Sequence, residues 1–209
     1  MIEFQPFPKL ARLSRGCVIT EKLDGTNAQI IIEKVPEDQR LLGVPEGHGP
    51  HNYITTNEGA FLIAAGSRTR LIAPGKTTDN FGFAAWVYEN SFELLKLGEG
   101  RHFGEWYGQG IQRGYGLTEK RFALFNTHRW HEQHPRPACV SVVPIIHVDE
   151  FSSYAVNRAM HCLETYGSLA VPGFMNPEGI VVYHEASKVS FKQTFDDKHK
   201  EAEASKEAA

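Results

Sequence analysis

The sequence has few cysteines, no long apolar run and no excess of positive charge, and each shortage excludes a class of protein. Its 3 cysteines are widely separated and lack the paired spacing of a zinc site or a disulfide framework. No apolar run is long enough to cross a membrane, and residues 1–13 lack the basic start and apolar core of a signal peptide. We therefore expect reduced thiols, a cytoplasmic protein and no membrane partner.

The charge and length limit the remaining classes. The formal net charge is -3 at pH 7, so the chain lacks the global positive field typical of nucleic-acid-binding proteins, and any such binding must use local basic residues. A chain of 209 residues, 41% of them hydrophobic, can bury one good core, or one core with a small appendage, but hardly forms two full domains. We expect one domain over residues 1–195, followed by a charged tail over residues 196–209 that is a solvated helix or disordered.

Residues 17–32 carry the most chemically reactive group of side chains in the sequence. Runs of β-branched and apolar residues lie on either side of Lys22, which is the composition of two strands that meet at a tight turn. A lysine amine is a poor nucleophile while it is protonated, and the neighbouring Glu21 and Asp24 favour the protonated form. A divalent cation or a polyphosphate would change that balance. Without one, a solvated surface hairpin is the alternative interpretation.

The rest of the chain alternates between strand-like and helix-like patterns. Strands are expected at 54–56, 61–65, 101–108, 121–126, 140–148, 179–183 and 188–192, with a hairpin turn at 57–59 between the first two. Helices are expected at 81–97 and 152–167, the second capped by Ser152 or Ser153 and ended by Gly167. Pro- and Gly-rich residues 35–52 are expected to form a loop or an irregular hairpin. The glycine-rich residues 109–116 are expected to form a mobile loop, in which Gln112 and Arg113 are possible substrate contacts.

Two groups of side chains have competing interpretations. Arg68 and Arg70 stand at alternate positions of a predicted strand, so they would share a face, either as a basic surface stripe or as ligand contacts. His128, His131 and His134 recur at every third position, but the prolines that follow argue against a regular helix there, and we expect no metal site.

Residues 21–27, EKLDGTN, resemble motif I of the covalent nucleotidyltransferases, the superfamily of ATP-dependent DNA ligases, RNA ligases and capping enzymes. This form of the motif is most similar to that of the RNA ligases. In the superfamily the motif lysine attacks the α-phosphate of ATP and forms a lysyl-AMP. The resemblance therefore implies that Lys22 is the nucleophile and that Glu21, Asp24 and Asn27 contact the nucleotide.

Four further segments resemble later motifs of the superfamily, in the same order along the chain. The strand around Glu105 is similar to motif III, and Phe125 matches the motif IIIa aromatic that stacks on the purine. Glu178 begins a segment similar to motif IV, in which Val181 would cover the other face of the base. Lys192 matches the second lysine of motif V and would contact the α-phosphate. The resemblance implies that Glu105 and Glu178 hold a divalent metal.

Some positions depart from the family pattern. Motif V usually carries two lysines, and here Ser190 occupies the first position, so a compensating role for Lys188 stays open. Arg68 best matches a family arginine that reaches the nucleotide and the nucleic-acid end, with Arg70 as a second contact. Asn126 stands where family members often have Asp.

Together these motifs imply an α+β fold: an ATP-grasp-like nucleotidyltransferase (adenylation) domain of twisted antiparallel sheets flanked by helices, with no room for an appended oligonucleotide-binding domain. The implied function is an ATP-dependent RNA ligase that joins 5′-phosphate and 3′-hydroxyl ends through lysyl-AMP, with ATP and Mg²⁺ or Mn²⁺ as cofactors. RNA ends are the implied partners, in a single strand, a nicked duplex or an RNA/DNA hybrid, and no protein partner is evident. The alternatives are a minimal ATP-dependent DNA ligase, a capping guanylyltransferase and a non-catalytic end-binding module of the same fold.

Overall fold

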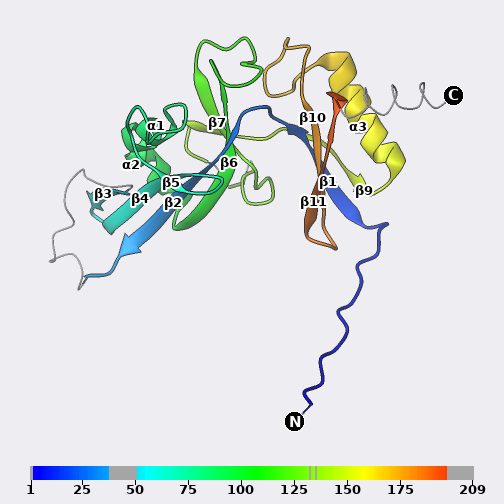
Figure 1. The fold of residues 1–209 in the computed structure, drawn as a ribbon, viewed down its shortest axis with the longest axis horizontal. Helices are drawn as coiled ribbons and strands as arrows, with labels where there is room; N and C mark the ends of the chain where they lie inside the picture. The colour runs from blue at the N-terminus through cyan, green and yellow to red at the C-terminus, as the bar shows by residue number, and fades with distance from the viewer. Residues whose placement is uncertain (1, 38–50, 132, 135, 197–209) are drawn as a thin grey trace. The chain divides into compact units, whose positions relative to one another are not determined.

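The computed structural model describes residues 2–37, 51–131, 133–134 and 136–196 (Figure 1). Most of the loop expected at 35–52 and residues 197–209 of the expected tail therefore lie outside the described residues. By its internal contacts the chain falls into two compact units: unit 1 comprises residues 1–22 and 144–209, and unit 2 comprises residues 23–143. Each unit is described by itself below, and the single domain expected over 1–195 stays a prediction.

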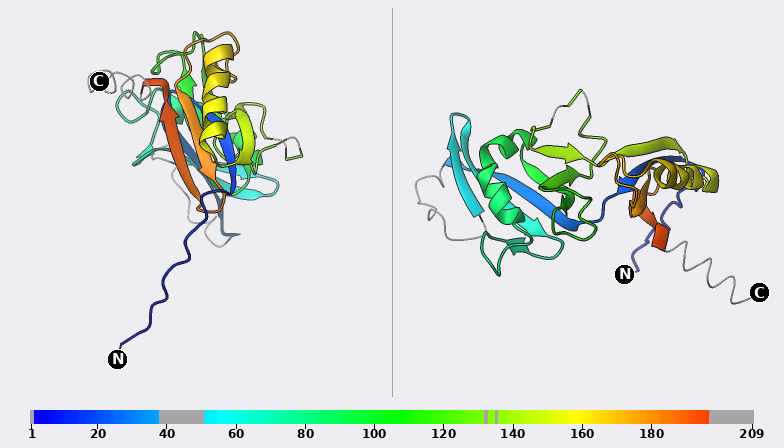
Figure 2. Two further views of the ribbon diagram at one scale, coloured as in Figure 1. Left: turned by 90° about the vertical axis from the view of Figure 1, so that its right-hand side faces the viewer. Right: turned by 90° about the horizontal axis from the view of Figure 1, so that it is seen from above.

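Unit 1 is built on an antiparallel sheet with a helix on one face. Among the described residues its strands have the order β11-β10-β1-β9, with the bounds β1 Gly16–Lys22, β9 Ile145–Glu150, β10 Gly179–His184 and β11 Val189–Thr194. Helix α3, Ser153–Tyr166, runs alongside these strands (Figure 2). It begins where predicted, because the Ser152 hydroxyl accepts a hydrogen bond from the Ala155 N–H at 3.1 Å.

Strand alternation decides which side chains of unit 1 meet the helix. Cys17 and Ile19 of β1 join a core with Ala159, Met160 and Leu163 of α3. Successive strand side chains point to opposite faces. Lys22 is an odd number of residues from both Cys17 and Ile19, so its side chain lies on the face away from α3.

Unit 2 is built on a larger sheet of seven strands among the described residues, in the order β3-β4-β2-β6-β7-β8, with β5 paired to β4. The bounds are β2 Thr26–Val35, β3 His51–Thr56, β4 Gly59–Ser67, β5 Leu71–Ile72, β6 Gly100–Gly108, β7 Lys120–Leu124 and β8 Val140–Val142. All neighbouring pairs are antiparallel except β7 and β8, which are parallel. Helix α1, Phe83–Glu89, packs against β4, and α2, Ser91–Leu94, packs against β3.

An aromatic cluster fills the core of unit 2. The Phe83 ring lies 5.2 Å from that of Phe122 and 5.4 Å from that of Trp106, measured between centroids. Ala28 and Ile30 of β2 complete this side of the sheet. The two sheets and few helices confirm the predicted α+β class. No helix in the described ranges is both long and apolar enough to cross a membrane.

The predicted tight turn between the first two strands is wrong. β1 pairs with β10 and β9, whereas β2 pairs with β4 and β6, so the two consecutive strands belong to different sheets. Residues 23–25 are therefore a connection from one sheet to the other. The hairpin predicted around Asn57-Glu58-Gly59 is confirmed by the pairing of β3 with β4.

The helix predicted over 81–97 is interrupted. Phe81 has a positive φ of 52° and precedes the helix, and the Asp79 carboxylate accepts hydrogen bonds from the Ala84 and Ala85 N–H groups at 2.8 and 3.1 Å. α1 ends at Glu89, and the side-chain amide of the next residue, Asn90, donates to the Trp86 carbonyl at 2.8 Å. α2 and the 3₁₀ helix η2, Leu95–Leu97, follow.

The buried strand predicted over 140–148 is two strands in two sheets. Pro144 lies between β8 and β9 and cannot donate to a strand ladder. The Val143 N–H donates to the Leu124 carbonyl in unit 2, and the Pro144 carbonyl accepts from the Glu21 N–H in unit 1. The Val148 side chain of β9 is 62% exposed, so the second half of the predicted strand is not buried.

Candidate functional site

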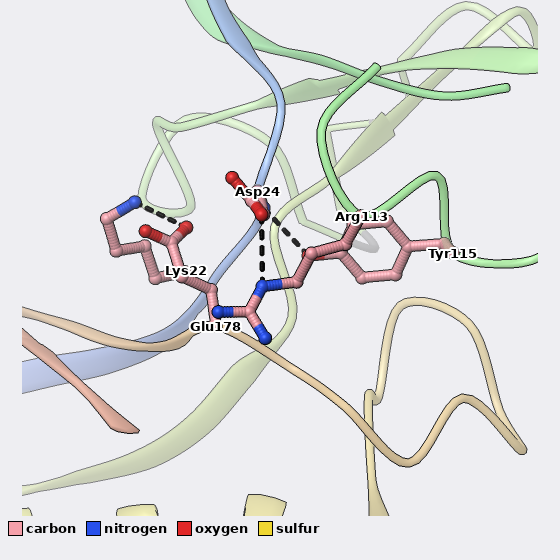
Figure 3. A network of polar contacts seen from close by, with 5 residues as sticks. All are labelled: Lys22, Asp24, Arg113, Tyr115 and Glu178. Atoms are coloured by element: carbon pink, nitrogen blue, oxygen red, sulfur yellow. Dashed lines mark hydrogen bonds and ion pairs between the residues drawn. The ribbon is translucent and has the colours of Figure 1, made fainter. Parts of the chain in front are cut away.

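Lys22 is the last residue of β1, and its amine is held by a carboxylate of the same unit. Its Nζ donates to Glu178 Oε2 at 2.5 Å (Figure 3). Glu178 directly precedes β10, and the register pairs Lys22 with Gly179, so the two side chains are brought together by strand pairing. Gly179 has φ 152°, and a Cβ there would lie 2.2 Å from the Gln193 carbonyl, which explains the glycine of this segment.

Two further predicted residues share the sheet face of Lys22. Thr20, Val181 and Lys192 are paired across β1, β10 and β11. Directly paired residues of antiparallel strands point to the same face, and Lys22 is two residues from Thr20. Unit 1 therefore gathers Lys22, Glu178, Val181 and Lys192 at one end of one sheet face.

Glu21 points to the opposite face and is 1% exposed. One carboxylate oxygen accepts from the Ser168 hydroxyl at 2.5 Å, and the other accepts from the Leu169 and Ala170 N–H groups at 2.8 and 2.9 Å. Burial raises the pKa of Glu21, against the lowering effect of these hydrogen bonds. The position of its side chain gives no support to the expected nucleotide contact, which stays a prediction.

Asp24 is held by the loop at 109–116 within unit 2. Arg113 Nε lies 3.0 Å from Asp24 Oδ2, and the Asp24 N–H donates to the Tyr115 hydroxyl at 2.7 Å (Figure 3). Tyr115 is buried and meets the edge of Tyr107 at 5.5 Å between centroids. The expected mobile loop is thus joined to the Asp24 segment by two side chains, and only Arg113 was considered from the sequence.

Asn27, Glu105 and Phe125 lie on one face of the unit 2 sheet. Asn27 pairs with Glu105, and both are an odd number of residues from the core-facing Ala28 and Trp106. Phe125 follows β7 on the same face, and its N–H donates to the Phe103 carbonyl at 2.9 Å. The absence of a side chain at Gly25 lets the start of β2 approach β6 closely, because a Cβ at Gly25 would lie 2.4 Å from the Trp106 carbonyl.

Two predicted site residues, Arg68 and Lys188, lie in turns at strand ends. The strand expected to carry Arg68 and Arg70 on one face is wrong, since β4 ends at Ser67. The Ser67 N–H donates to the Arg70 carbonyl at 2.8 Å, which closes a tight turn and leaves both arginines exposed. Lys188 lies in the turn between β10 and β11 with φ 59°, where its N–H donates to the His184 carbonyl.

The sequence profile of the RNA ligase family matches residues 15–196, which include every segment described above. The chain belongs to the RNA ligase family. No curated protein matches the sequence. The predicted motif order therefore led to the correct family, and the fold of this RNA ligase family member is the nucleotidyltransferase fold expected from it.

Solved structures show the same fold. A variant of the Naegleria gruberi RNA ligase with ATP and Mn is 17% identical, with a TM-score of 0.52 over 90% of this chain and 52% of that chain. The same ligase with PPi is 19% identical with a TM-score of 0.51, and an apo variant is 20% identical with a TM-score of 0.51, each over 90% of this chain and 52% of that one. This family member thus spans about half the length of the ligase chains it matches.

Oxygen donors for a hard cation are present, but not as a closed cage. The described residues of this family member contain no group of three or more His, Cys, Asp or Glu side chains that could hold a metal ion. Mg²⁺ commonly binds through one or two carboxylates and takes its other ligands from phosphates and water. Single carboxylates at Glu178 and Glu105 fit that mode. His131 Nε2 and His134 Nδ1 lie 3.1 Å apart but belong to no such group.

Proposed function

We propose that this protein is an ATP-dependent RNA ligase that joins 5′-phosphate and 3′-hydroxyl ends through lysyl-AMP and adenylylated-end intermediates. The observation that carries the proposal is the position of Lys22, which is the last residue of β1 and whose amine contacts Glu178. The Lys22 side chain also shares a sheet face with Val181 and Lys192. Membership of the RNA ligase family supports RNA rather than DNA as the substrate.

In the first step Lys22 Nζ attacks the α-phosphate of ATP. A nitrogen–phosphorus bond forms while the bond from the α-phosphorus to the pyrophosphate oxygen breaks, and pyrophosphate leaves. The attacking amine must carry no extra proton, so a protonated Lys22 Nζ gives up a proton to solvent or to the hydrogen-bonded Glu178 carboxylate before this step. Lys192 supplies a positive charge on the same sheet face for the phosphate that receives the attack.

Two further transfers complete the proposed reaction. AMP passes from Lys22 to the 5′-phosphate of an RNA strand, and the 3′-hydroxyl of the other strand then attacks that phosphate and displaces AMP. Such transfers depend on positioning and on neutralising phosphate charge. Within unit 2 the half-exposed ring of Phe125 is our candidate for stacking on adenine, and within unit 1 Val181 is our candidate for an apolar contact with the base.

The proposed cofactors are ATP and a divalent cation, Mg²⁺ or Mn²⁺, in line with the ATP and Mn of the Naegleria ligase structure. Glu178 within unit 1 and Glu105 within unit 2 are the carboxylates proposed to bind a divalent cation. When bound, it supplies charge neutralisation for the polyphosphate. The cytoplasm stays the expected location, and a nicked duplex or an RNA/DNA hybrid stays a possible form of the substrate.

The substrate assignment is tested with four nicked duplexes that differ only in whether the sugar on each side of the nick is ribose or deoxyribose. A site that senses the 2′-hydroxyl distinguishes RNA from DNA directly, so we expect efficient sealing only when ribose carries the 3′-hydroxyl. Equal sealing with deoxyribose at that end would contradict the RNA assignment and favour a DNA ligase. Sealing of none of the four, with intact adenylylation of Lys22, would point to a different end structure.

A further inference from the structure

A row of side chains crosses the unit 2 sheet on the face opposite its core. Gly66 of β4 pairs with Gln29 of β2, and Gln29 pairs with Phe103 of β6. Phe125 continues the row, because its N–H donates to the Phe103 carbonyl. Neighbouring strands lie about 4.8 Å apart, so the row from Gln29 to Phe125 extends roughly 10 Å, enough for more than one ring-sized ligand group.

Phe103 is exposed where a strand-centre phenylalanine is usually buried. Its side chain is 47% exposed, and that of Phe125 is 40% exposed. Two residues before Phe103 on the same strand face lies Arg101, which is also exposed. An aromatic ring flanked by a cation is the combination with which proteins bind single-stranded nucleic acid, the ring stacking on a base and the cation meeting a phosphate.

The Gln29 amide adds an unusual polar group to the same row. Its Nε2 donates to the Ser67 carbonyl at 3.0 Å, whereas its Oε1 is buried and has no hydrogen-bond partner within the part of the chain that the structure describes. Gly66 makes room for this side chain, since a Cβ there would lie 2.7 Å from Gln29 Cγ. A buried polar atom without a partner calls for an explanation, and a turn of the Gln29 amide toward a donor group on a ligand in the row would provide one.

We propose that Phe103 is a second base platform, which stacks on a terminal base of the RNA strand, with Arg101 placed for a backbone phosphate and the Gln29 side chain beside the ring as a polar neighbour of the bound base. This inference rests on the proposed function, in which Phe125 takes the adenine of ATP. It adds a nucleic-acid subsite beside that position. It also gives an acidic chain the local aromatic and basic contacts that RNA binding requires.

The test compares Phe103→Ala with Phe103→Trp and with a matched control, Phe92→Ala, which removes an exposed phenylalanine of α2 outside the row. Binding of a nicked RNA duplex is measured by fluorescence anisotropy without ATP, and adenylylation of Lys22 is measured without RNA. We expect Phe103→Ala to raise the dissociation constant for RNA about tenfold. The rate of adenylylation without RNA should change by less than about twofold. Phe103→Trp should restore binding, and the control should match the wild type in both assays.

Two results would overturn the proposal. The first is unchanged RNA binding in Phe103→Ala. The second is a loss of adenylylation as large as that caused by Phe125→Ala, which would place Phe103 in the adenine site. Wild-type protein that binds RNA but forms no lysyl-AMP would refute the proposed function alone, and the binding comparison would still decide the role of Phe103.

Discussion

Replacing Glu21 by alanine should destabilise unit 1 strongly, because its carboxylate is the acceptor for three donors. The change removes the acceptor of the part-buried hydrogen bonds from the Leu169 and Ala170 N–H groups, and the hydroxyl of the buried Ser168 loses its partner. Each unsatisfied buried donor costs about 1–3 kcal/mol. The relief of an unfavourably buried charge offsets part of this cost. We expect a net loss of about 2–4 kcal/mol in the free energy of unfolding.

The assay is urea unfolding of Glu21→Ala and of a matched control, Glu164→Ala, whose side chain is exposed on α3. The control should stay within about 0.5 kcal/mol of the wild type. Glu21→Gln keeps one acceptor oxygen and should lose less than Glu21→Ala. A Glu21→Ala protein as stable as the wild type, but with weakened ATP binding, would refute the reasoning and make Glu21 a nucleotide ligand.

The same carboxylate predicts a pH dependence. Burial raises the pKa of Glu21 above its ordinary value of 4.5, so between 4.5 and the raised pKa the folded protein keeps a proton that the unfolded chain has lost. This contribution to stability is present below 4.5 and is lost as the pH rises through the folded pKa. We therefore expect the stability of the wild type relative to Glu21→Gln to fall with rising pH across this window. If the difference in free energy of unfolding between the wild type and Glu21→Gln rose with pH, a raised pKa of Glu21 could not be its cause.

The remaining predictions concern the site itself. Glu178→Ala should reduce adenylylation at least about tenfold in folded protein, because a metal-binding carboxylate serves chemistry rather than stability; equal losses of melting temperature and activity would make it structural. Phe125→Ala should weaken the use of ATP more than the sealing of a pre-adenylylated strand, and the reverse would assign this ring to RNA. A double-mutant cycle on Asp24 and Arg113, a partly buried pair, should give a coupling of about 1 kcal/mol, and a coupling near zero would mean that the loop is not held by this contact.

Local signals in the sequence predicted the elements whose ends are decided locally. The Ser152 cap and the final glycine placed α3, and the turn residues 57–59 placed the β3–β4 hairpin. The pairing of β1 was not predictable in this way, because Lys22 meets Glu178 across 156 positions of the chain. Two adjacent apolar runs look like a hairpin when only the near neighbours are considered.

Resemblance named the candidate residues of the site, but it did not name their neighbours in the structure. The register places Gln29 and Phe103 beside the Phe125 position, and no local pattern marks them. Tyr115 contacts Asp24 across 91 positions from within a glycine-rich segment, where sequence alone favours a mobile loop. Glu21 lies next to the predicted nucleophile, but strand alternation turns it to the other face.

The most direct test of the account is the covalent state of Lys22 after incubation of the purified protein with ATP and Mg²⁺. Intact mass and peptide mapping should find one AMP, bound through an acid-labile and base-stable bond, on the peptide that contains Lys22. The modification should be absent in Lys22→Ala and retained in Lys96→Ala, which removes an exposed lysine paired with Glu93. AMP that is incorporated equally into Lys22→Ala, or wild-type protein that takes up none, would contradict the assignment of Lys22 as the nucleophile.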